Sequence, residues 1–400
     1  MSQDPPIGRV VATEKNPTTT GGFRFWLAEG VNLKPFDFVR VEPPDDAAAE
    51  IGSFFAIIDE IKQVSDEPSP LSSFISSDFG DSTQVPRVGR IVTTYADATV
   101  LYNTKRIEMP VPHGSLVTWP DEEGVRLALG INDYSRNTPA GYIEMSGPGG
   151  RTIVINVDMD ADYLIGPEGA HMNISGVSGL ATKTSYAMFL LSAIQQRQAS
   201  EEWRDDAQAS FVILNVKGAD LLRLHEVDDD LAEATREGWS KCGLTAAPLD
   251  HVTYYYPYGS GERETQVQSK LDHPEVLANL ESGRAFRYFY DVEAALERLG
   301  LLFEDMDDPN QTLDSCASHC IDNVPPSNPW RTLRSKVQQW ASETPDKRIQ
   351  VGSWRRFARL FRQRTHNAIF TEGGEDKQVR LSEQLGDLEP GHVAVIDIAE

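Results

Sequence analysis

The residues of this chain best suited to chemistry are Lys183, Thr184 and Ser185, which follow a run of small residues. The whole stretch reads GVSGLATKTS, and an apolar segment, YAMFLLSAI, comes next. A loop that binds phosphates needs small residues, so that backbone amides converge on the anion, and a helix whose positive end begins there. It also needs a lysine that reaches the β- and γ-phosphates and a hydroxyl group that binds Mg²⁺. The residue types in this stretch therefore indicate phosphate-binding chemistry.

Each residue of the stretch contributes one of these properties. Glycines supply a permissive backbone, small side chains keep the loop compact, and one lysine is its only cation. The candidate nucleotide-binding residues are Gly176, Ser178, Gly179, Ala181, Thr182, Lys183, Thr184 and Ser185.

The stretch also departs from the usual phosphate-binding loop in two ways. Six residues separate Gly176 from Lys183, one more than in the common pattern, and Thr182 occupies the place of its second glycine. An ordinary strand–turn–helix corner with one surface lysine fits the same letters. Spacing alone leaves both interpretations open.

The region before the loop divides into two parts. Residues 7 to about 120 contain short β-branched and aromatic runs separated by Gly, Pro and Asp, which predict a small barrel or sandwich. After about Leu127, a hairpin is predicted around Gly147 to Gly150. A strand, the loop, an apolar helix and the run FVILNVKG then follow, and this order is typical of an α/β unit with a buried parallel sheet.

The second half is mostly helical in pattern, with one aromatic strand candidate, VTYYYPYG, and it ends on another apolar run, HVAVIDIAE. We therefore expect an all-β barrel over residues 1–125 and the first part of an α/β core over 126–224. A helical insertion is expected over 225–385 and a returning core strand over 386–400. A domain that stops on a core strand indicates a core that is incomplete at the C-terminus, or a boundary at Glu400.

Composition limits the class of protein. The chain has 400 residues, and its 37 basic and 61 acidic residues give a formal net charge of −24. Such a chain repels polyphosphates over most of its surface, so any nucleic acid must bind at a local basic patch or inside a ring. Three cysteines, no signal pattern and no apolar run long enough for a bilayer favour a cytoplasmic protein without a membrane association.

The loop and its flanks together resemble the HerA-like branch of the HerA/FtsK ring ATPases. The matching pieces are DYLIGPEGAHMNISGVSGLATKTS and FVILNVKGADLL. Members of this group carry a GPEGAH lead-in, and some bacterial members have the same ATKTS form of the loop. The strand-rich N-terminal region is similar to the small β-barrel that precedes their ATPase core. The resemblance thus covers most of residues 7–224 and the last strand.

The resemblance implies a P-loop core of the RecA/FtsK type and a hexameric DNA translocase, or helicase-type motor, driven by ATP and Mg²⁺. It implies double-stranded DNA through the ring and a partner nuclease or anti-phage effector. By motif match, Lys183 is the phosphate-binding, catalytic lysine and Thr184 is the Mg²⁺ ligand.

Two parts of the family's site do not occur after Lys183: an acidic pair that activates water, and an arginine finger. Read alone, VAVIDIAE places Asp397 at a strand end where it could hold a metal. The family pattern makes this the strand before the acidic pair, with the catalytic glutamate beyond Glu400, and we favour that interpretation.

Two further patterns have a structural and a functional interpretation. CASHC brings Cys316, His319 and Cys320 together, but no further ligands at metal spacing are evident, so buried helical thiols are the better prediction. WRRFARLFRQR, residues 354–364, is the strongest basic run. It predicts a helix with an apolar stripe of Trp354, Phe357, Leu360 and Phe361, whose arginines are either solvated or contact phosphates or an acidic partner.

Two functions from different classes follow. The first is a ring ATPase that couples ATP hydrolysis to DNA translocation. The second is a ring scaffold that binds nucleotide and organises an effector without significant hydrolysis. A third interpretation, a small-molecule kinase with a P-loop, is disfavoured by the barrel and by the lack of a lid pattern.

Overall fold

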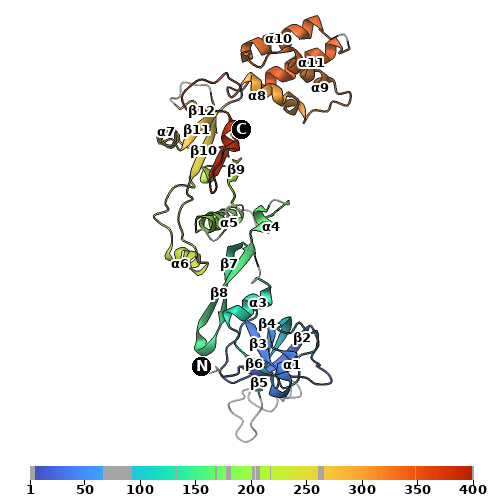
Figure 1. Cartoon of the computed structure of the whole chain (residues 1–400), viewed down its shortest axis with the longest axis vertical. Coiled ribbons are helices and arrows are strands. Elements are labelled where there is room, and N and C mark those ends of the chain that lie inside the picture. Colours follow the sequence, from blue (N-terminus) through green and yellow to red (C-terminus); the bar gives the residue numbers. More distant parts are fainter. Residues whose placement is uncertain are drawn as a thin grey trace, which may run out of the picture. The chain divides into compact units, whose positions relative to one another are not determined.

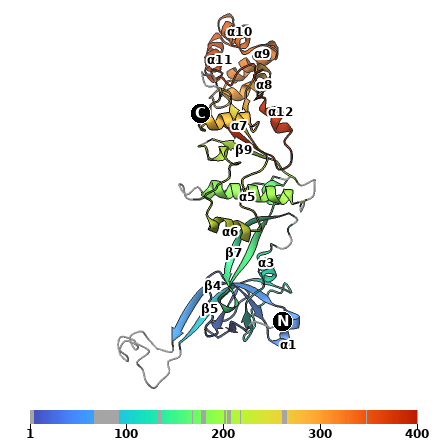
Figure 2. The same cartoon turned by 90° about the vertical axis from the view of Figure 1, so that its left-hand side faces the viewer.

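A computed structural model describes residues 5–65, 92–131, 134, 136–166, 169–176, 182–200, 203, 208–216, 218–259, 265–346 and 348–398 (Figures 1 and 2). The chain forms two compact units. Unit 1 comprises Met1–Arg197 and Leu231–Ala246, and unit 2 comprises Gln198–Asp230 and Ala247–Glu400. No helix in the described part of the chain is both long and apolar enough to cross a membrane.

Unit 1 contains a closed β-barrel. Its strands are ordered β1-β2-β5-β4-β3-β6, and β6 pairs with β1 to close it. The bounds are β1 Gly8–Val11, β2 Gly22–Leu27, β3 Phe38–Glu42, β4 Phe54–Ser65, β5 Val92–Asn103 and β6 Leu116–Thr118, with helix α1 at Asp45–Ile51. Alternate side chains such as Phe23 and Phe25 point inward because successive residues of a strand face opposite sides. The predicted small β-barrel is confirmed.

A helix and a hairpin pack on the barrel. Helix α3 (Glu122–Leu129) precedes the antiparallel pair β7 (Asn137–Ser146) and β8 (Thr152–Asp160), whose turn lies at Pro148–Gly150. The predicted hairpin around Gly147 to Gly150 is therefore confirmed. Buried apolar contacts between the barrel, α3 and the hairpin are made by Phe38, Val125, Met145 and Ile155.

Three further helices belong to unit 1, and one of them begins within the predicted phosphate loop. Helix α5 (Thr182–Ala199) packs through Phe189 and Ala193 against Trp239 of α6 (Glu233–Lys241) and the residues that follow it. The short helix α4 (Asp162–Ile165) lies earlier in the chain. The strand expected before the loop is not formed: residues 171–176 have no regular secondary structure. Met172 is exposed, and the segment pairs with no described strand.

Unit 2 is built on a parallel sheet of order β12-β11-β10-β13-β9 (Figure 1). The bounds are β9 Phe211–Asn215, β10 Val252–Pro257, β11 Ala285–Tyr288, β12 Gln378–Val379 and β13 Val393–Asp397. Every neighbouring pair is parallel. The prediction of an α/β domain with a parallel sheet is confirmed. Strands β10, β11 and β12 lie within residues 225–385, which the sequence pattern assigns to a helical insertion.

The two apolar runs assigned to buried strands differ in burial. All five residues of β13 are buried, because this strand lies between β10 and β9. Strand β9 lies at an edge of the sheet, and Val212 and Leu214 on it are 49% and 59% exposed. The continuous apolar run FVILN thus correctly predicts a strand. The same run wrongly predicts that both faces of this strand are buried.

The helices that interrupt the sheet occur mainly between β11 and β12, and we call them the helical insert. It comprises α8 (Val292–Glu297), the 3₁₀ helix η6 (Leu299–Phe303), α9 (Thr312–Asn323), α10 (Trp330–Glu343) and α11 (Val351–Arg364). Outside it, unit 2 also contains η5 (Asp220–Leu222), α7 (His273–Glu281) and α12 (Leu381–Gly386). Trp354, Phe357 and Phe361 are buried in the insert's core, and Leu360 packs against it, so the predicted apolar stripe is confirmed.

Candidate functional site

The N-terminus of α5 carries the side chains predicted to meet phosphates. Lys183, Thr184 and Ser185 are all exposed in its first turn. The first turn contains no acidic residue, so the positive end of the helix dipole is not offset by a carboxylate of its own. Most of the residues after Ser185 in α5 are Ala, Leu, Met or Gln, which favour helix. The local sequence thus produces a helix start that suits an anion.

A hollow of about 640 Å³ lies beside this helix start. Lys183 and Ser185 line one part of it, together with Ile174 and Ser175 from the segment before the loop. Aromatic side chains line the remainder: Tyr186, Phe189 and Trp239. The hollow therefore combines a cation, a hydroxyl group and an aromatic wall, a combination that suits a ligand with an anionic group and a flat ring.

Only some of the predicted site residues lie at the hollow, and others fall outside the described residues. Lys183 and Ser185 line the hollow, Thr184 lies between them in the sequence, and Gly176, the first residue of the loop, is exposed. Helix α5 begins at Thr182, whose side chain is outside the description. The remaining candidates lie outside the described residues: Ser178, Gly179 and Ala181.

Three aromatic residues of the hollow were missed by sequence reasoning. Tyr186 stacks on Phe189 with ring centroids 6.0 Å apart, and Phe189 meets Trp239 edge to face at 5.0 Å. The Tyr186 hydroxyl donates to the Ala140 carbonyl at 3.0 Å, and burial raises its pKa. Trp239 comes from another helix, and no motif in the sequence connects it with Lys183. The YAMF pattern after the loop reads only as a helix that packs on a core.

A second polar group lies in unit 2, where β9 and β13 end. Asp397 is 1% exposed, its Oδ1 accepts a hydrogen bond from Asn215 Nδ2 at 3.0 Å, and its Oδ2 accepts one from Ser269 Oγ at 2.7 Å. Burial raises the pKa of the carboxyl group, although the hydrogen bonds oppose the shift. Both carboxylate oxygens thus have protein donors, which favours a structural role over metal binding.

The cysteine pattern on α9 is structural. Cys316 and Cys320 are fully buried, and burial raises the pKa of the Cys316 thiol to about 12. His319 instead packs edge to face against Trp340 and Trp354. Burial of this kind disfavours the thiolate, which is the form that binds metals. Buried helical thiols, the predicted alternative, are confirmed. Across the described ranges, no three potential metal ligands of the His, Cys, Asp or Glu type form a cluster.

A scan against protein-family models and a search of curated proteins both found no match to this chain.

Proposed function

We propose that this chain belongs to a HerA-like, ATP-driven ring motor that translocates double-stranded DNA. One observation carries the proposal: Lys183 and Ser185 line a hollow at the start of α5, directly after the small-residue run. A helix start, a lysine and hydroxyl groups are the parts from which P-loop proteins build a triphosphate site. The barrel in unit 1 and the parallel sheet in unit 2 are compatible with the architecture that the resemblance implies.

Different residues of α5 would contact different parts of MgATP. Lys183 would neutralise charge on the β- and γ-phosphates, and the backbone amides of the helix start would bind their oxygens. Thr184, exposed beside it, would hold Mg²⁺, which on binding would offset the charge that develops on the transferred phosphoryl group. The aromatic wall of Phe189 and Trp239 would contact the flat part of the nucleotide.

We infer a cytoplasmic hexamer that encloses duplex DNA and works with a nuclease or an anti-phage effector. A ring of this kind reconciles a net charge of −24 with DNA binding, because contact is confined to local basic surfaces.

One observation supports the second candidate, a scaffold that binds nucleotide without significant hydrolysis. Asp397, at the end of β13, is buried and already holds Asn215 and Ser269. It is therefore poorly placed to activate water or bind a metal. A catalytic carboxylate would then have to be another acidic residue, from this subunit or from a neighbouring one.

Displacement of a third strand from a DNA triplex separates the two candidates. A motor removes the third strand when MgATP is present, and Lys183→Ala abolishes the removal. A scaffold binds the nucleotide but leaves the triplex intact. Lys15→Ala, which removes an exposed lysine of unit 1 outside the hollow, is the matched control and should behave as wild type.

A further inference from the structure

Helix α11 concentrates positive charge in an acidic chain. It contains five arginines and no acidic residue, whereas the chain as a whole has a net charge of −24. Like charges this close together on one helix repel one another unless an anion offsets them. The partners of the five arginines therefore indicate what the helix is built to bind.

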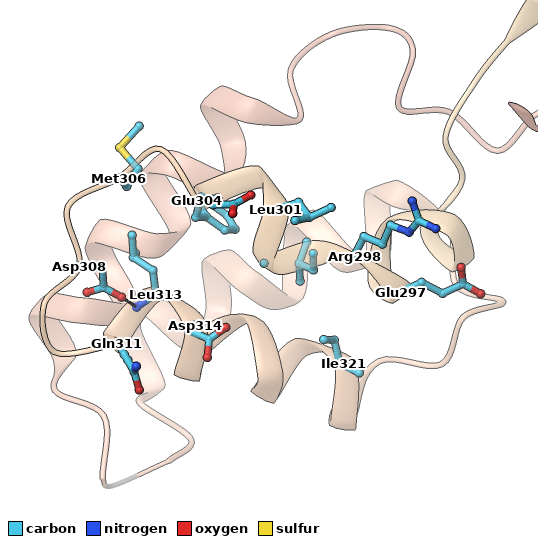
Figure 3. Close-up of a pocket in the computed structure, with 13 residues that line it drawn as sticks. Glu297, Arg298, Leu301, Glu304, Met306, Asp308, Gln311, Leu313, Asp314 and Ile321 are labelled. Carbon is cyan, nitrogen blue, oxygen red and sulfur yellow. Dashed lines mark hydrogen bonds between the residues drawn. The ribbon is translucent and has the colours of Figure 1, made fainter. Parts of the chain in front are cut away.

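Two of the five arginines face acidic residues of the helical insert itself. Arg356 donates to the Asp307 carbonyl at 2.8 Å and lies 4.0 Å from the Asp308 carboxylate, and Arg364 contacts Asp305 at 2.5 Å. This side of the insert is strongly acidic. A hollow of about 820 Å³ on α8, η6 and α9 is lined by four carboxylates, Glu297, Glu304, Asp308 and Asp314, and by one arginine, Arg298 (Figure 3).

The other three arginines have a different environment. Arg355, Arg359 and Arg362 are exposed, and none of them forms an ion pair or hydrogen bond with another residue that the structure describes. Their spacing of four and three residues places them along one face of the helix, with Cα positions about 6 Å and about 10.5 Å from the first along its axis. The three guanidinium groups thus form a row of cations that are free to bind an anion from outside the described part of the chain.

These three side chains share one hollow of about 400 Å³ between α10 and α11. Gln338 and Ser342 of α10 line its other side, and the buried residues Ala341 and Ala358 lie within it. The acidic residue nearest in sequence on α10, Glu343, accepts hydrogen bonds from Gln339 and does not line the hollow. The hollow, which we call the arginine groove, thus presents three guanidinium groups and two neutral polar side chains.

The chemistry of the arginine groove matches a phosphate backbone. A guanidinium group is a planar fork that binds phosphate oxygens in pairs, and Gln and Ser side chains commonly complete such contacts. Among the described residues, no aromatic side chain lines the groove, so these residues offer no platform on which unpaired bases could stack. This favours the backbone of a duplex over single-stranded nucleic acid, and contact without sequence preference.

We propose that the arginine groove binds the phosphate backbone of duplex DNA. The inference deepens the proposed function, because it assigns a DNA contact to the translocase, but it requires neither nucleotide nor hydrolysis. The acidic hollow on α8, η6 and α9 repels the same DNA, so the helical insert would meet the duplex with one side only.

The test measures how tightly the full-length protein binds duplex DNA in the absence of nucleotide. Fluorescence anisotropy reports the binding at each of a series of salt concentrations. The variant Arg355→Gln/Arg359→Gln/Arg362→Gln keeps long polar side chains and removes three charges. Because each phosphate contact contributes about 0.9 to the slope of log K against log [salt], the slope should fall by up to about 2.7, with affinity reduced on the order of tenfold or more. Arg298→Gln, in the acidic hollow, is the control and should leave both quantities unchanged.

Three results would overturn the inference. Wild-type affinity and salt slope in the triple variant would show that the groove does not contact DNA, as would a wild-type protein that binds no duplex at low salt. A change of oligomeric state in the triple variant, measured by light scattering with DNA binding intact, would assign the groove to a contact between copies. An intact thermal melt excludes misfolding as the cause of any loss. If triplex displacement depends on Lys183 but not on these arginines, the proposed motor function is retained and the role of the groove in DNA binding is rejected.

Discussion

Asn215 donates a hydrogen bond of 3.0 Å to Asp397, a residue 182 positions later in the chain. The two residues are direct partners at the ends of the parallel strands β9 and β13. Asn215 Nδ2 also donates to the Gly218 carbonyl at 3.1 Å, and the Tyr288 hydroxyl donates to the Asp397 carbonyl at 3.0 Å. This buried network fixes the strand register and the turn after β9, so the carboxylate of Asp397 serves the fold.

Removing the charge of Asp397 should change how unit 2 responds to pH. The folded pKa is raised above the ordinary value of 3.8, so the ionised form costs stability in the folded state. The contribution of Asp397 to the free energy of unfolding is therefore greatest at a pH below the ordinary pKa of 3.8. It is lost as the pH rises through the folded pKa. Asp397→Asn lacks this titration, so its free energy of unfolding should fall less than that of wild type between about pH 4 and pH 7.

Denaturant unfolding at several pH values measures this difference. Asp387→Asn, which removes an exposed carboxylate near the same end of the chain, is the control and should retain the wild-type pH dependence. An Asp397→Asn profile parallel to that of wild type would contradict the raised pKa.

Trp354 should be a principal source of stability in the helical insert. Its side chain is fully buried and contacts His319, Trp340 and Phe357. Trp354→Ala should destabilise the insert by about 3–5 kcal/mol, because a large cavity remains. Trp354→Phe should cost less, since it keeps an aromatic ring and removes an indole N–H that has no hydrogen-bond partner among the described residues. Thermal unfolding of the three proteins checks this order, and equal losses in both variants would refute it.

The aromatic wall of the hollow beside Lys183 should contribute to nucleotide binding. Trp239→Ala removes the edge-to-face contact with Phe189 and one side of the hollow. An aromatic contact of about 1 kcal/mol predicts a loss of roughly fivefold in affinity for a fluorescent ATP analogue. Trp239→Phe should keep most of the affinity. Unchanged binding in Trp239→Ala would place the base of the nucleotide elsewhere.

The sequence predicts the elements of this chain better than their neighbours in space. Short β-branched and aromatic runs such as FRFWLA, separated by Gly, Pro and Asp, predict the barrel, because these residue types favour strands and the residues between them favour turns. The aromatic run Tyr254–Tyr256 was recognised as a strand, but its place beside β13 depends on pairing that local pattern does not encode. The exposure of Leu214 on β9 has the same origin, since edge and central strands have similar residues.

The candidate site shows the same division. The residue types of the loop predicted a helix start with Lys183 in its first turn, because small residues and hydroxyl groups have local conformational preferences. Trp239 and the link between Asn215 and Asp397 arise from contacts between distant segments. The arginine groove was predictable in part. The basic run is visible in the sequence, but only the packing of α10 against α11 shows that Arg359 lines a groove whereas Arg356 has an acidic partner.

The rate of Mg²⁺-dependent ATP hydrolysis by the full-length protein, measured with and without duplex DNA, tests whether the start of α5 is the nucleotide site of a motor. We predict that DNA stimulates turnover in wild type and in Lys15→Ala, and that Lys183→Ala abolishes turnover under both conditions. Equal turnover in wild type and Lys183→Ala, or none in wild type with DNA present, would contradict the assignment of a phosphate-binding motor to the start of α5.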